Sequence, residues 1–247
     1  MTPLVWLITG CTSGFGKHFV HQILARGDKV IATGVDVLQL DVTDTQQSLD
    51  ATMAKTIGIH GRIDVLVNNA AFIQAGAVED LEHEDWLAEF DTNVFGVIKV
   101  TKALLPHFRT RKAGTMVFIS SRSGWVGDPF VPAYLGSKFA LEGIVESLRP
   151  DTSPLGICTM LIEPGRFQTK LLSSRNMVPR YSTIPDYGQA SKDFFAGLAK
   201  EDMNQPGVTA KGASIILNLV RKEGVAEERD VPWRLLIGTD CYEGIKE

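Results

Sequence analysis

The chain has 247 residues, of which 44% are hydrophobic and 22% charged, and this balance excludes an intrinsically disordered or collagen-like protein. The net charge of −4 provides no basic surplus of the kind that nucleic-acid-binding proteins carry. The three cysteines lie far apart and do not form the pattern of a disulfide framework. No segment resembles a secretion signal or approaches the ~18 apolar residues of a membrane-spanning helix. We therefore expect a cytoplasmic protein without nucleic-acid or membrane partners.

Strand-like and helix-like segments alternate along the chain. Residues 4–8 are an apolar run typical of a parallel strand buried on both faces, and a helix with one apolar face follows at 15–26. Further strands are predicted at residues 29–33, 37–40, 63–67, 115–120, 157–162 and 233–237, and further helices at 44–58, 83–108, 133–148 and 210–222. This alternation predicts a single α/β domain over residues 1–247, with a Rossmann-type doubly wound parallel sheet in a three-layer α/β/α arrangement.

One connection breaks the pattern. At most three residues join the strand ending near Thr33 to the next one, which starts near Val35 or Asp36. Parallel neighbours need a crossover of about a dozen residues or more. Either this edge holds an antiparallel hairpin, or a segment is missing near Thr33–Val35, and we favour the missing segment. The chain also stops in a helix-like stretch at residues 244–247, which fits a shortened C-terminus.

A glycine-rich turn, Thr9-Gly-Cys-Thr-Ser-Gly-Phe-Gly16, lies between the first predicted strand and the first helix. Glycines there permit a tight turn and let the backbone approach a diphosphate, and the helix N-terminus offers unpaired N–H groups to it. In an open α/β sheet, this turn lies at the carboxyl edge, where ligands bind. An ordinary glycine-rich turn is the alternative, but the position directly after a buried N-terminal strand favours a cofactor site.

Tyr134 and Lys138 are four residues apart on a predicted helix, so they share one of its faces. An adjacent ammonium stabilises tyrosinate and thereby lowers the pKa of a phenol from its usual value of about 10. The pair therefore indicates a general acid/base for a carbonyl or alcohol oxygen. Taken alone, the same spacing also fits a Tyr–Lys pair on a helix surface.

Two further side chains complete a candidate catalytic set. Ser121 follows the strand predicted at 115–120 and can donate a hydrogen bond to a substrate oxygen, although Ser120 and Ser123 compete for that role and a serine here can also cap a helix. Asn93 is a poor helix former inside a predicted helix. It indicates either a tolerated polar residue or a residue that holds water in a proton relay behind Lys138.

These motifs, in order from Thr9 to about Thr169, resemble the short-chain dehydrogenase/reductase family. The resemblance implies a catalytic tetrad of Asn93, Ser121, Tyr134 and Lys138. It also implies a nicotinamide cofactor held by Gly10, Thr12, Ser13, Gly14, Phe15, Gly16, Asp41, Val42, Asn69, Ala70, Tyr134, Lys138, Pro164, Gly165 and Thr169. Residues 25–32 are most similar to fungal ketoreductases of secondary metabolism and to retinol- or steroid-type dehydrogenases.

What the resemblance implies is an NADP(H)-dependent oxidoreductase that interconverts a ketone or aldehyde and an alcohol on an apolar small molecule. NADP(H) is favoured because similar fungal members commonly carry an arginine after the second strand, with Lys17 as weak support, and NAD(H) stays open. A homodimer or homotetramer is implied in the same way. We expect the substrate pocket to include the segment after Ser121, with Trp125 and Phe130, and a lid at about residues 171–205.

Two departures from the family pattern keep other functions open. Ala71 replaces the last glycine of the Asn-Asn-Ala-Gly element, where its methyl group either crowds the cofactor or is silent. The short connection near Asp36 leaves no residue placed to choose between a ribose 2′-hydroxyl and a 2′-phosphate. A non-redox biosynthetic enzyme on the same scaffold, such as a cyclase, dehydratase or isomerase, is therefore the alternative. A non-catalytic regulator that binds nucleotide is a third hypothesis.

Overall fold

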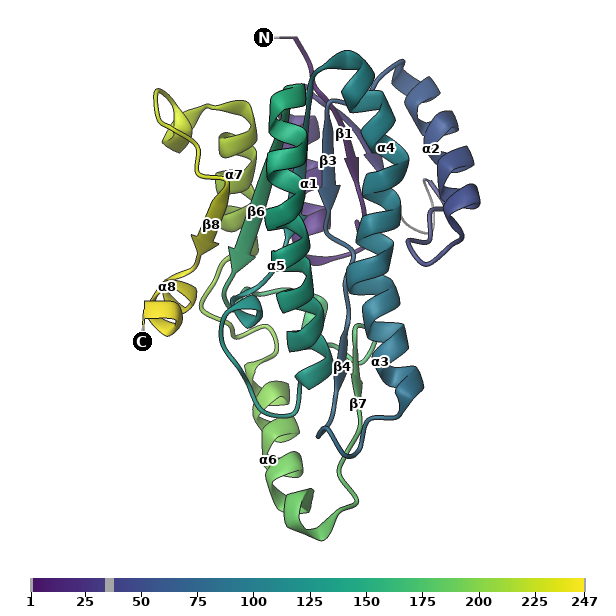
Figure 1. The fold of residues 1–247 in the computed structure, drawn as a ribbon. Helices are drawn as coiled ribbons and strands as arrows, with labels where there is room; N and C mark the ends of the chain where they lie inside the picture. The colour runs from purple at the N-terminus through teal and green to yellow at the C-terminus, as the bar shows by residue number, and fades with distance from the viewer. Residues whose placement is uncertain (1, 34–37, 247) are drawn as a thin grey trace.

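The computed structural model describes residues 2–33 and 38–246, and the central feature of this part of the chain is a six-stranded parallel sheet with the order β2-β1-β3-β5-β6-β8 (Figure 1). Its strands are β1 (Val5–Ile8), β2 (Lys29–Ala32), β3 (Val65–Asn68), β5 (Gly114–Ile119), β6 (Ile157–Pro164) and β8 (Arg234–Ile237). The order reverses at β1, as in a doubly wound fold. The predicted Rossmann-like single domain is confirmed.

Helices cover both faces of the sheet. They are α1 (Gly14–Ala25), α2 (Gln46–His60), α3 (His83–Phe90), α4 (Val97–Arg111), α5 (Pro132–Thr152), α6 (Pro185–Glu201), α7 (Thr209–Arg221) and α8 (Thr239–Lys246). Helices α2, α4 and α5 lie on the face toward the viewer, and α1 and α7 lie behind it (Figure 1). Short 3-10 turns at residues 122–124, 153–155, 170–172 and 224–226 join these elements. The predicted three-layer α/β/α arrangement is confirmed.

The position of β1 in the sheet explains why its sequence is apolar throughout. Val5 and Leu7 are buried in the cluster formed with α2, α4 and α5, whereas Trp6 and Ile8 are buried in the cluster formed with α1 and α7. Successive side chains of a strand point to opposite faces, and both faces are covered here. Each of the two layers of helices therefore shares its core with every second residue of the strand.

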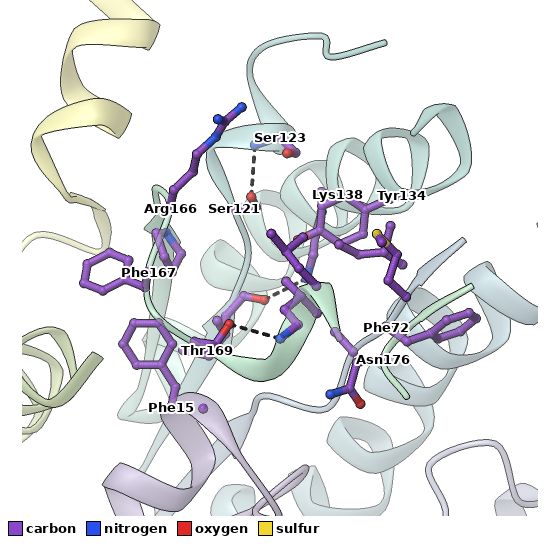
Figure 2. Close-up of a pocket in the computed structure, with 18 of the residues that line it drawn as sticks. Phe15, Phe72, Ser121, Ser123, Tyr134, Lys138, Arg166, Phe167, Thr169 and Asn176 are labelled. Atoms are coloured by element: carbon purple, nitrogen blue, oxygen red, sulfur yellow. Dashed lines mark hydrogen bonds between the residues drawn. The ribbon is translucent and has the colours of Figure 1, made fainter. Parts of the chain in front are cut away.

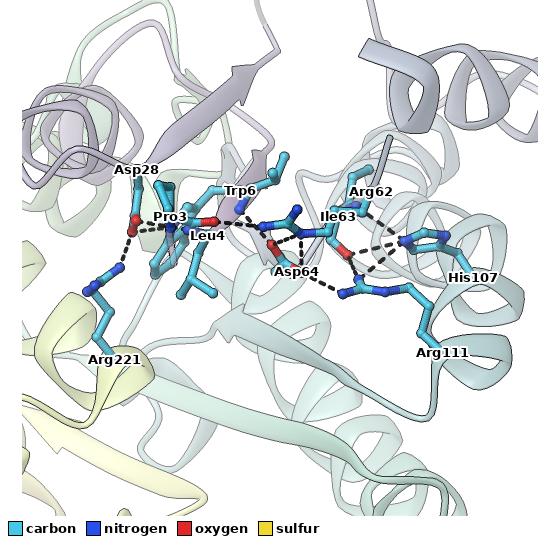
Figure 3. A network of polar contacts seen from close by, with 11 residues as sticks. Pro3, Leu4, Trp6, Asp28, Arg62, Ile63, Asp64, His107, Arg111 and Arg221 are labelled. Carbon is cyan, nitrogen blue, oxygen red and sulfur yellow. Dashed lines mark hydrogen bonds and ion pairs between the residues drawn. The ribbon is translucent and has the colours of Figure 1, made fainter. Parts of the chain in front are cut away.

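Asp64 fixes the start of β1 at the amino-terminal edge of the sheet (Figure 3). Its carboxylate accepts a hydrogen bond of 2.9 Å from the backbone N–H of Val5 and pairs with Arg111 at 2.7 Å and Arg62 at 2.9 Å. Burial raises the pKa of this carboxyl, but the hydrogen bonds from Arg111, Val5 and Arg62 outweigh it and leave the pKa below its usual value. The ionised form of Asp64 is thus the one that the fold stabilises.

Asp28, in the turn before β2, holds the same strand from its other side (Figure 3). It accepts hydrogen bonds from the backbone N–H of Leu4 at 2.9 Å and from the indole of Trp6 at 3.0 Å, and it pairs with Arg221 of α7. Because Asp28 and Arg221 are both largely buried, their charges compensate one another. These contacts fix the register of β1 and so the position of the glycine turn that follows it.

The prediction of a strand at residues 37–40 is wrong for residues 38–40, which the structure describes. Leu38 makes an isolated parallel bridge with Thr33, and Gln39 and Leu40 belong to no strand. The physical reason is the one noted above: the connection is too short to bring a full parallel strand alongside β2. The break expected near Thr33–Val35, and Asp36 itself, involve positions 34–37, which lie outside the described residues, so the missing segment stays a prediction.

The helix predicted at residues 83–108 forms in three parts. Helix α3 passes into a π-helical turn at Asp91–Gly96 and then into α4. Such turns are rare in proteins, and those that occur are often at functional sites. This one carries Asn93. Two strands that were not predicted, β4 (Ile73–Ala75) and β7 (Met177–Pro179), pair in parallel below the main sheet, beside α3 (Figure 1).

Candidate active site

A cavity of about 380 Å³ opens at the carboxyl edge of the sheet (Figure 2). It lies among the glycine turn, the ends of β3, β5 and β6, the start of α5 and the segment after Thr169. Most of the predicted site residues line it: Gly10, Thr12, Ser13, Gly14, Phe15, Asn69, Ala70, Ser121, Tyr134, Lys138, Pro164, Gly165 and Thr169. Gly16, Asp41, Val42 and Asn93 do not line it. The fold therefore brings together residues separated by more than half of the chain.

The glycine turn is shaped by close backbone contacts. Gly10 and Gly14 have backbone φ angles of +69° and +51°, in the left-handed region that favours glycine. A Cβ on Gly16 would lie 2.2 Å from the carbonyl oxygen of Gly10, so the packing of the turn requires glycine there, and the expected contact of Gly16 with a cofactor stays a prediction. The side-chain amide of Asn69 donates to the carbonyl oxygens of Thr9 and Gly10, each at 2.9 Å. These contacts leave the N-terminus of α1 facing the cavity, which suits a diphosphate.

Asp41 and Val42 lie away from the cavity. Asp41 is exposed, and its carboxylate accepts hydrogen bonds from the backbone N–H and the hydroxyl of Thr43 at 2.9 and 2.7 Å. The side chain of Val42 is buried in the core against the backbone of Gly96. Their expected contact with the adenine of a cofactor stays a prediction.

Tyr134 and Lys138 face the cavity from the first two turns of α5, which starts at Pro132, a residue suited to the first position of a helix. The Lys138 amine lies 5.5 Å from the centre of the Tyr134 ring and donates to the carbonyl oxygen of Ile119 at 3.1 Å. The spacing of four residues thus produces the predicted proximity. Figure 2 shows both side chains on the same wall of the cavity.

The predicted lowering of the Tyr134 pKa is not found in the protein alone. Burial raises the pKa of Tyr134 above its usual value, and the nearby Glu89 raises it further, while the neighbouring Ser121 hydroxyl acts in the opposite direction. Burial also lowers the pKa of Lys138 to about 8, against the attraction of Glu89 and Glu142. The spacing of the two residues reports the charge of Lys138 but not the burial of both groups.

The three neighbouring serines have different surroundings. Ser121 accepts a hydrogen bond of 3.1 Å from the backbone N–H of Ser123, and its hydroxyl lies near enough to the Tyr134 phenol to lower the pKa of that group. Ser120 is buried and donates its hydroxyl to Glu142. All three serines line the cavity, but Ser121 is the one of the three that acts on the pKa of the phenol. The geometry therefore favours Ser121 among the three.

Asn93 lies behind the cavity rather than in its wall. It is buried, donates to the carbonyl oxygen of Phe72 at 2.9 Å and accepts from the Phe72 N–H at 3.2 Å. Its amide also donates to Glu89, one turn earlier on α3. The sequence analysis missed Glu89, although its position four residues before Asn93 places the two on one helix face.

The remaining wall of the cavity is mostly apolar. From the segment predicted as a lid it includes Leu171, Leu172, Met177, Phe194 and Leu198, with the polar Asn176, Glu201 and Gln205. Trp125 and Phe130 do not line the cavity, contrary to expectation: the Trp125 ring stacks on Arg234, 4.8 Å away, and the Phe130 ring packs on Phe194 at 5.4 Å. Tyr181 and Tyr187, from the same segment, are exposed.

Comparisons with known proteins agree with this geometry. The family model for short chain dehydrogenase matches residues 32–178, more than half of the chain. The chain belongs to the short-chain dehydrogenase/reductase family. Oxidoreductase BOA17 from Botryotinia fuckeliana is 34% identical over 257 residues, covering 97% of this chain and 90% of that protein. Human retinol dehydrogenase 8 is 34% identical over 227 residues, covering 81% and 71% of the two chains.

Solved structures of short-chain dehydrogenases share the fold. One from Streptomyces avermitilis has a TM-score of 0.85 and 32% identity, covering 99% of this chain and 91% of that one. ElxO with NADP bound has a TM-score of 0.75 and 25% identity, covering 95% and 96%. A structure from Burkholderia phymatum in complex with NAD has a TM-score of 0.80 at 18% identity, covering 99% and 92%, and shows the fold alone.

As a member of the short-chain dehydrogenase/reductase family, this protein is an oxidoreductase, as the chemistry of its cavity also indicates. Ala71, the departure from the family's glycine, lines the cavity without a positive φ, so its methyl group causes no backbone strain. Across the residues that the structure describes, no helix has the length and apolar character needed to cross a membrane.

Proposed function

We propose that this protein transfers a hydride between a nicotinamide cofactor, preferentially NADP(H), and a ketone or aldehyde on an apolar small molecule, which it interconverts with the alcohol. The observation that carries the proposal is the grouping of Ser121, Tyr134 and Lys138 on one wall of a cavity whose floor is the glycine turn. A bound nicotinamide supplies or accepts the hydride, and the residues of this chain supply alignment and the proton.

The side chains divide the work as follows. In reduction, the Tyr134 phenol donates its proton to the substrate oxygen as that oxygen gains negative charge, and in oxidation it accepts the proton. The Ser121 hydroxyl, which lies near enough to the phenol to lower its pKa, orients the same oxygen. The ammonium of Lys138 faces the ring at 5.5 Å and stabilises the tyrosinate that forms. Asn93, through Phe72 and Glu89, keeps the wall behind them in place.

The cofactor site fits a dinucleotide by its shape. The N-terminus of α1 faces the cavity, and the glycines of the preceding turn leave room for a diphosphate against the backbone. The preference for NADP(H) is supported by the NADP-bound ElxO structure and by the resemblance noted above. The residues that would choose between the two cofactors follow β2, where positions 34–37 lie outside the described residues.

The apolar side chains of residues 171–205 support an apolar substrate, and we propose that this segment acts as a lid. It lies over the cavity and joins the body through the β4–β7 pair and through an ion pair of 3.0 Å between Arg180 and Asp85. A ring or chain of carbon atoms that replaces water against Met177, Phe194 and Leu198 gains about 25 cal/mol for each Å² of apolar surface buried.

A binding and turnover experiment tests the proposal. NADPH and NADH are titrated separately against the fluorescence of the four tryptophans, and the loss of NADPH absorbance is then followed with phenanthrenequinone, an apolar diketone, as probe. Tighter binding of NADPH together with ketone-dependent loss of NADPH is expected. Failure to bind either cofactor contradicts the proposal and favours the non-redox enzyme or the regulator. Tighter binding of NADH contradicts the cofactor preference only.

Further expectations concern assembly and location. We propose a homodimer or homotetramer with no nucleic-acid or membrane partner, in the cytoplasm. Sedimentation equilibrium of the purified protein measures the first, and a single species with the monomer mass of 27.0 kDa contradicts it.

A further inference from the structure

Glu89 is a buried carboxylic acid whose charge has no part in the roles described above. It lies on the last turn of α3, and its side chain is completely shielded from solvent. The backbone N–H of Gln74, on β4, donates to one of its oxygens at 2.7 Å. The Ser137 hydroxyl donates to the other at 3.1 Å, and the amide of Asn93 donates to that same oxygen. Three elements of the fold therefore hold this one carboxyl group in place.

The donors around Glu89 match an ionised carboxylate, which can only accept hydrogen bonds. The neutral form is also accommodated, because Ser137 has a second partner. Its hydroxyl oxygen lies 2.7 Å from the backbone carbonyl oxygen of Tyr134. When Glu89 carries a proton, Glu89 can donate to Ser137 and Ser137 can donate to Tyr134. The group can thus gain and lose a proton without leaving a buried donor unpaired.

Lys138 lies next in sequence to Ser137 and needs a counter-charge. Its side chain is 3% exposed, and a buried ammonium without an anion is unstable. Two buried carboxyls, Glu89 and Glu142, attract it. Glu142, however, already pairs with Arg234 at 2.8 Å. Glu89, by contrast, is held by uncharged donors, one of them the hydroxyl of Ser137, the residue next to Lys138. Its charge and that of Lys138 act on one another, so Glu89 is the carboxylate available to compensate the ammonium.

We propose that Glu89 is a positioning residue of this site, whose carboxylate compensates the buried ammonium of Lys138 and keeps Lys138 charged at and above neutral pH. The role of Lys138 rests on the proposed function, whereas the charge relation between the two residues does not. Since the tyrosinate of Tyr134 depends on that ammonium, Glu89 sets the upper pH limit of the reaction without touching substrate or cofactor.

The titratable and charged groups around this pair are few. From α5, Lys138, Tyr134 and Glu142 face it; from α3 comes Glu89 itself, and β4 and the π-helical turn contribute the uncharged donors of Gln74 and Asn93. Burial raises the pKa of Glu89 to about 7, so it becomes ionised in the range just below the pKa of about 8 of Lys138. The Glu89 carboxylate therefore forms in the pH range in which Lys138 would otherwise lose its proton.

The test follows the charge of Lys138 directly, without any turnover. Protein made with isotope-labelled lysine gives a signal from the carbon next to each amine, and the signal absent in Lys138→Arg identifies residue 138. In the wild type we expect this signal to titrate near pH 8, with a first inflection near pH 7 from Glu89. In Glu89→Gln we expect the first inflection to vanish and the titration to move about one unit or more lower.

Two control variants separate charge from structure. Glu84→Gln removes an exposed carboxylate from the same helix and should leave the titration unchanged. Glu89→Asp keeps the charge and should restore much of the wild-type titration even where the shorter side chain lowers stability. If Lys138 titrates at the same pH in Glu89→Gln as in the wild type, or if the wild type lacks the first inflection, the proposal is wrong. The second criterion needs no variant at position 89 and uses Lys138→Arg only to assign the signal, and neither criterion depends on cofactor or ketone.

Discussion

The amine of Lys138 lies 5.5 Å from the centre of the Tyr134 phenol ring. The same amine donates to the carbonyl oxygen of Ile119, at the end of β5, and so ties α5 to the sheet. The phenol is therefore held at the carboxyl edge of the sheet, beside the glycine turn. This position brings the phenol to the substrate oxygen, and it also buries the phenol and so raises its pKa.

Replacing Tyr134 with phenylalanine removes the phenolic proton while keeping the ring that packs against its neighbours. We expect turnover of the probe ketone to fall by at least about 100-fold, the usual lower range for loss of a general acid. The dissociation constant for NADPH should change little, because the glycine turn is untouched. Steady-state kinetics and fluorescence titration measure the two quantities, and unchanged turnover would eliminate Tyr134 as the proton donor.

Gly16→Ala tests the shape of the glycine turn. The added methyl group would lie 2.2 Å from the backbone oxygen of Gly10, so the turn has to move. We expect a lower melting temperature and weaker NADPH binding. Gly58→Ala is the matched control, since it adds the same methyl group to a helix where nothing lies within 4 Å, and should stabilise by about 0.5–1 kcal/mol. Equal effects of the two substitutions on NADPH binding would contradict this account of the turn.

The sequence was sufficient for the elements whose pattern is local. The apolar run of β1 predicts a strand covered on both faces, and the spacing of Tyr134 and Lys138 predicts their shared helix face. Each of these depends on residues within one or two turns of the chain. The same is true of the glycine turn, because glycine is the residue type that tolerates the left-handed φ found at Gly10 and Gly14.

Features set by distant contacts were not predictable. The three-residue strands β4 and β7 are too short to show a periodic pattern and form only because residues 73 and 177 meet in space. The raised pKa of Tyr134 depends on burial by several elements, which spacing does not report. Glu89 is an ordinary glutamate in the sequence, and only the packing of α3, β4 and α5 makes it a buried partner of Asn93 and Ser137.

Asp64→Asn tests the anchor of β1. The variant keeps the shape but loses the charge that Arg111 and Arg62 face, and we expect the free energy of unfolding to fall by about 1–3 kcal/mol. Because the folded state lowers the pKa of Asp64, its contribution is present above the unfolded value of about 3.9 and is lost as the pH falls further. Urea unfolding near neutral pH and in acid measures this, and the difference between wild type and variant should shrink in acid. A constant difference would contradict the role of the charge.

Glu163 makes the stability depend on pH in the opposite sense. Its side chain is fully buried on β6, and burial together with the nearby Glu142 raises its pKa to about 8, although Arg234 lies 3.1 Å away. The folded protein thus keeps a proton that the unfolded chain releases near pH 4.3, roughly the ordinary value for glutamate. Between these two values the native state binds more protons, so the free energy of unfolding falls as the pH rises.

Glu163→Gln replaces the protonated acid by a neutral group of the same shape, so it should flatten this dependence. We expect the wild type to lose more stability than the variant between about pH 6 and about pH 8.5, measured as urea midpoints at constant salt. A smaller slope should remain in the variant, because burial also raises the pKa of Glu89, to about 7. Glu84→Gln, which removes an exposed carboxylate, is the control and should follow the wild type. If the slopes of wild type and Glu163→Gln coincide, Glu163 is ionised in the folded protein and Arg234 compensates its charge in full.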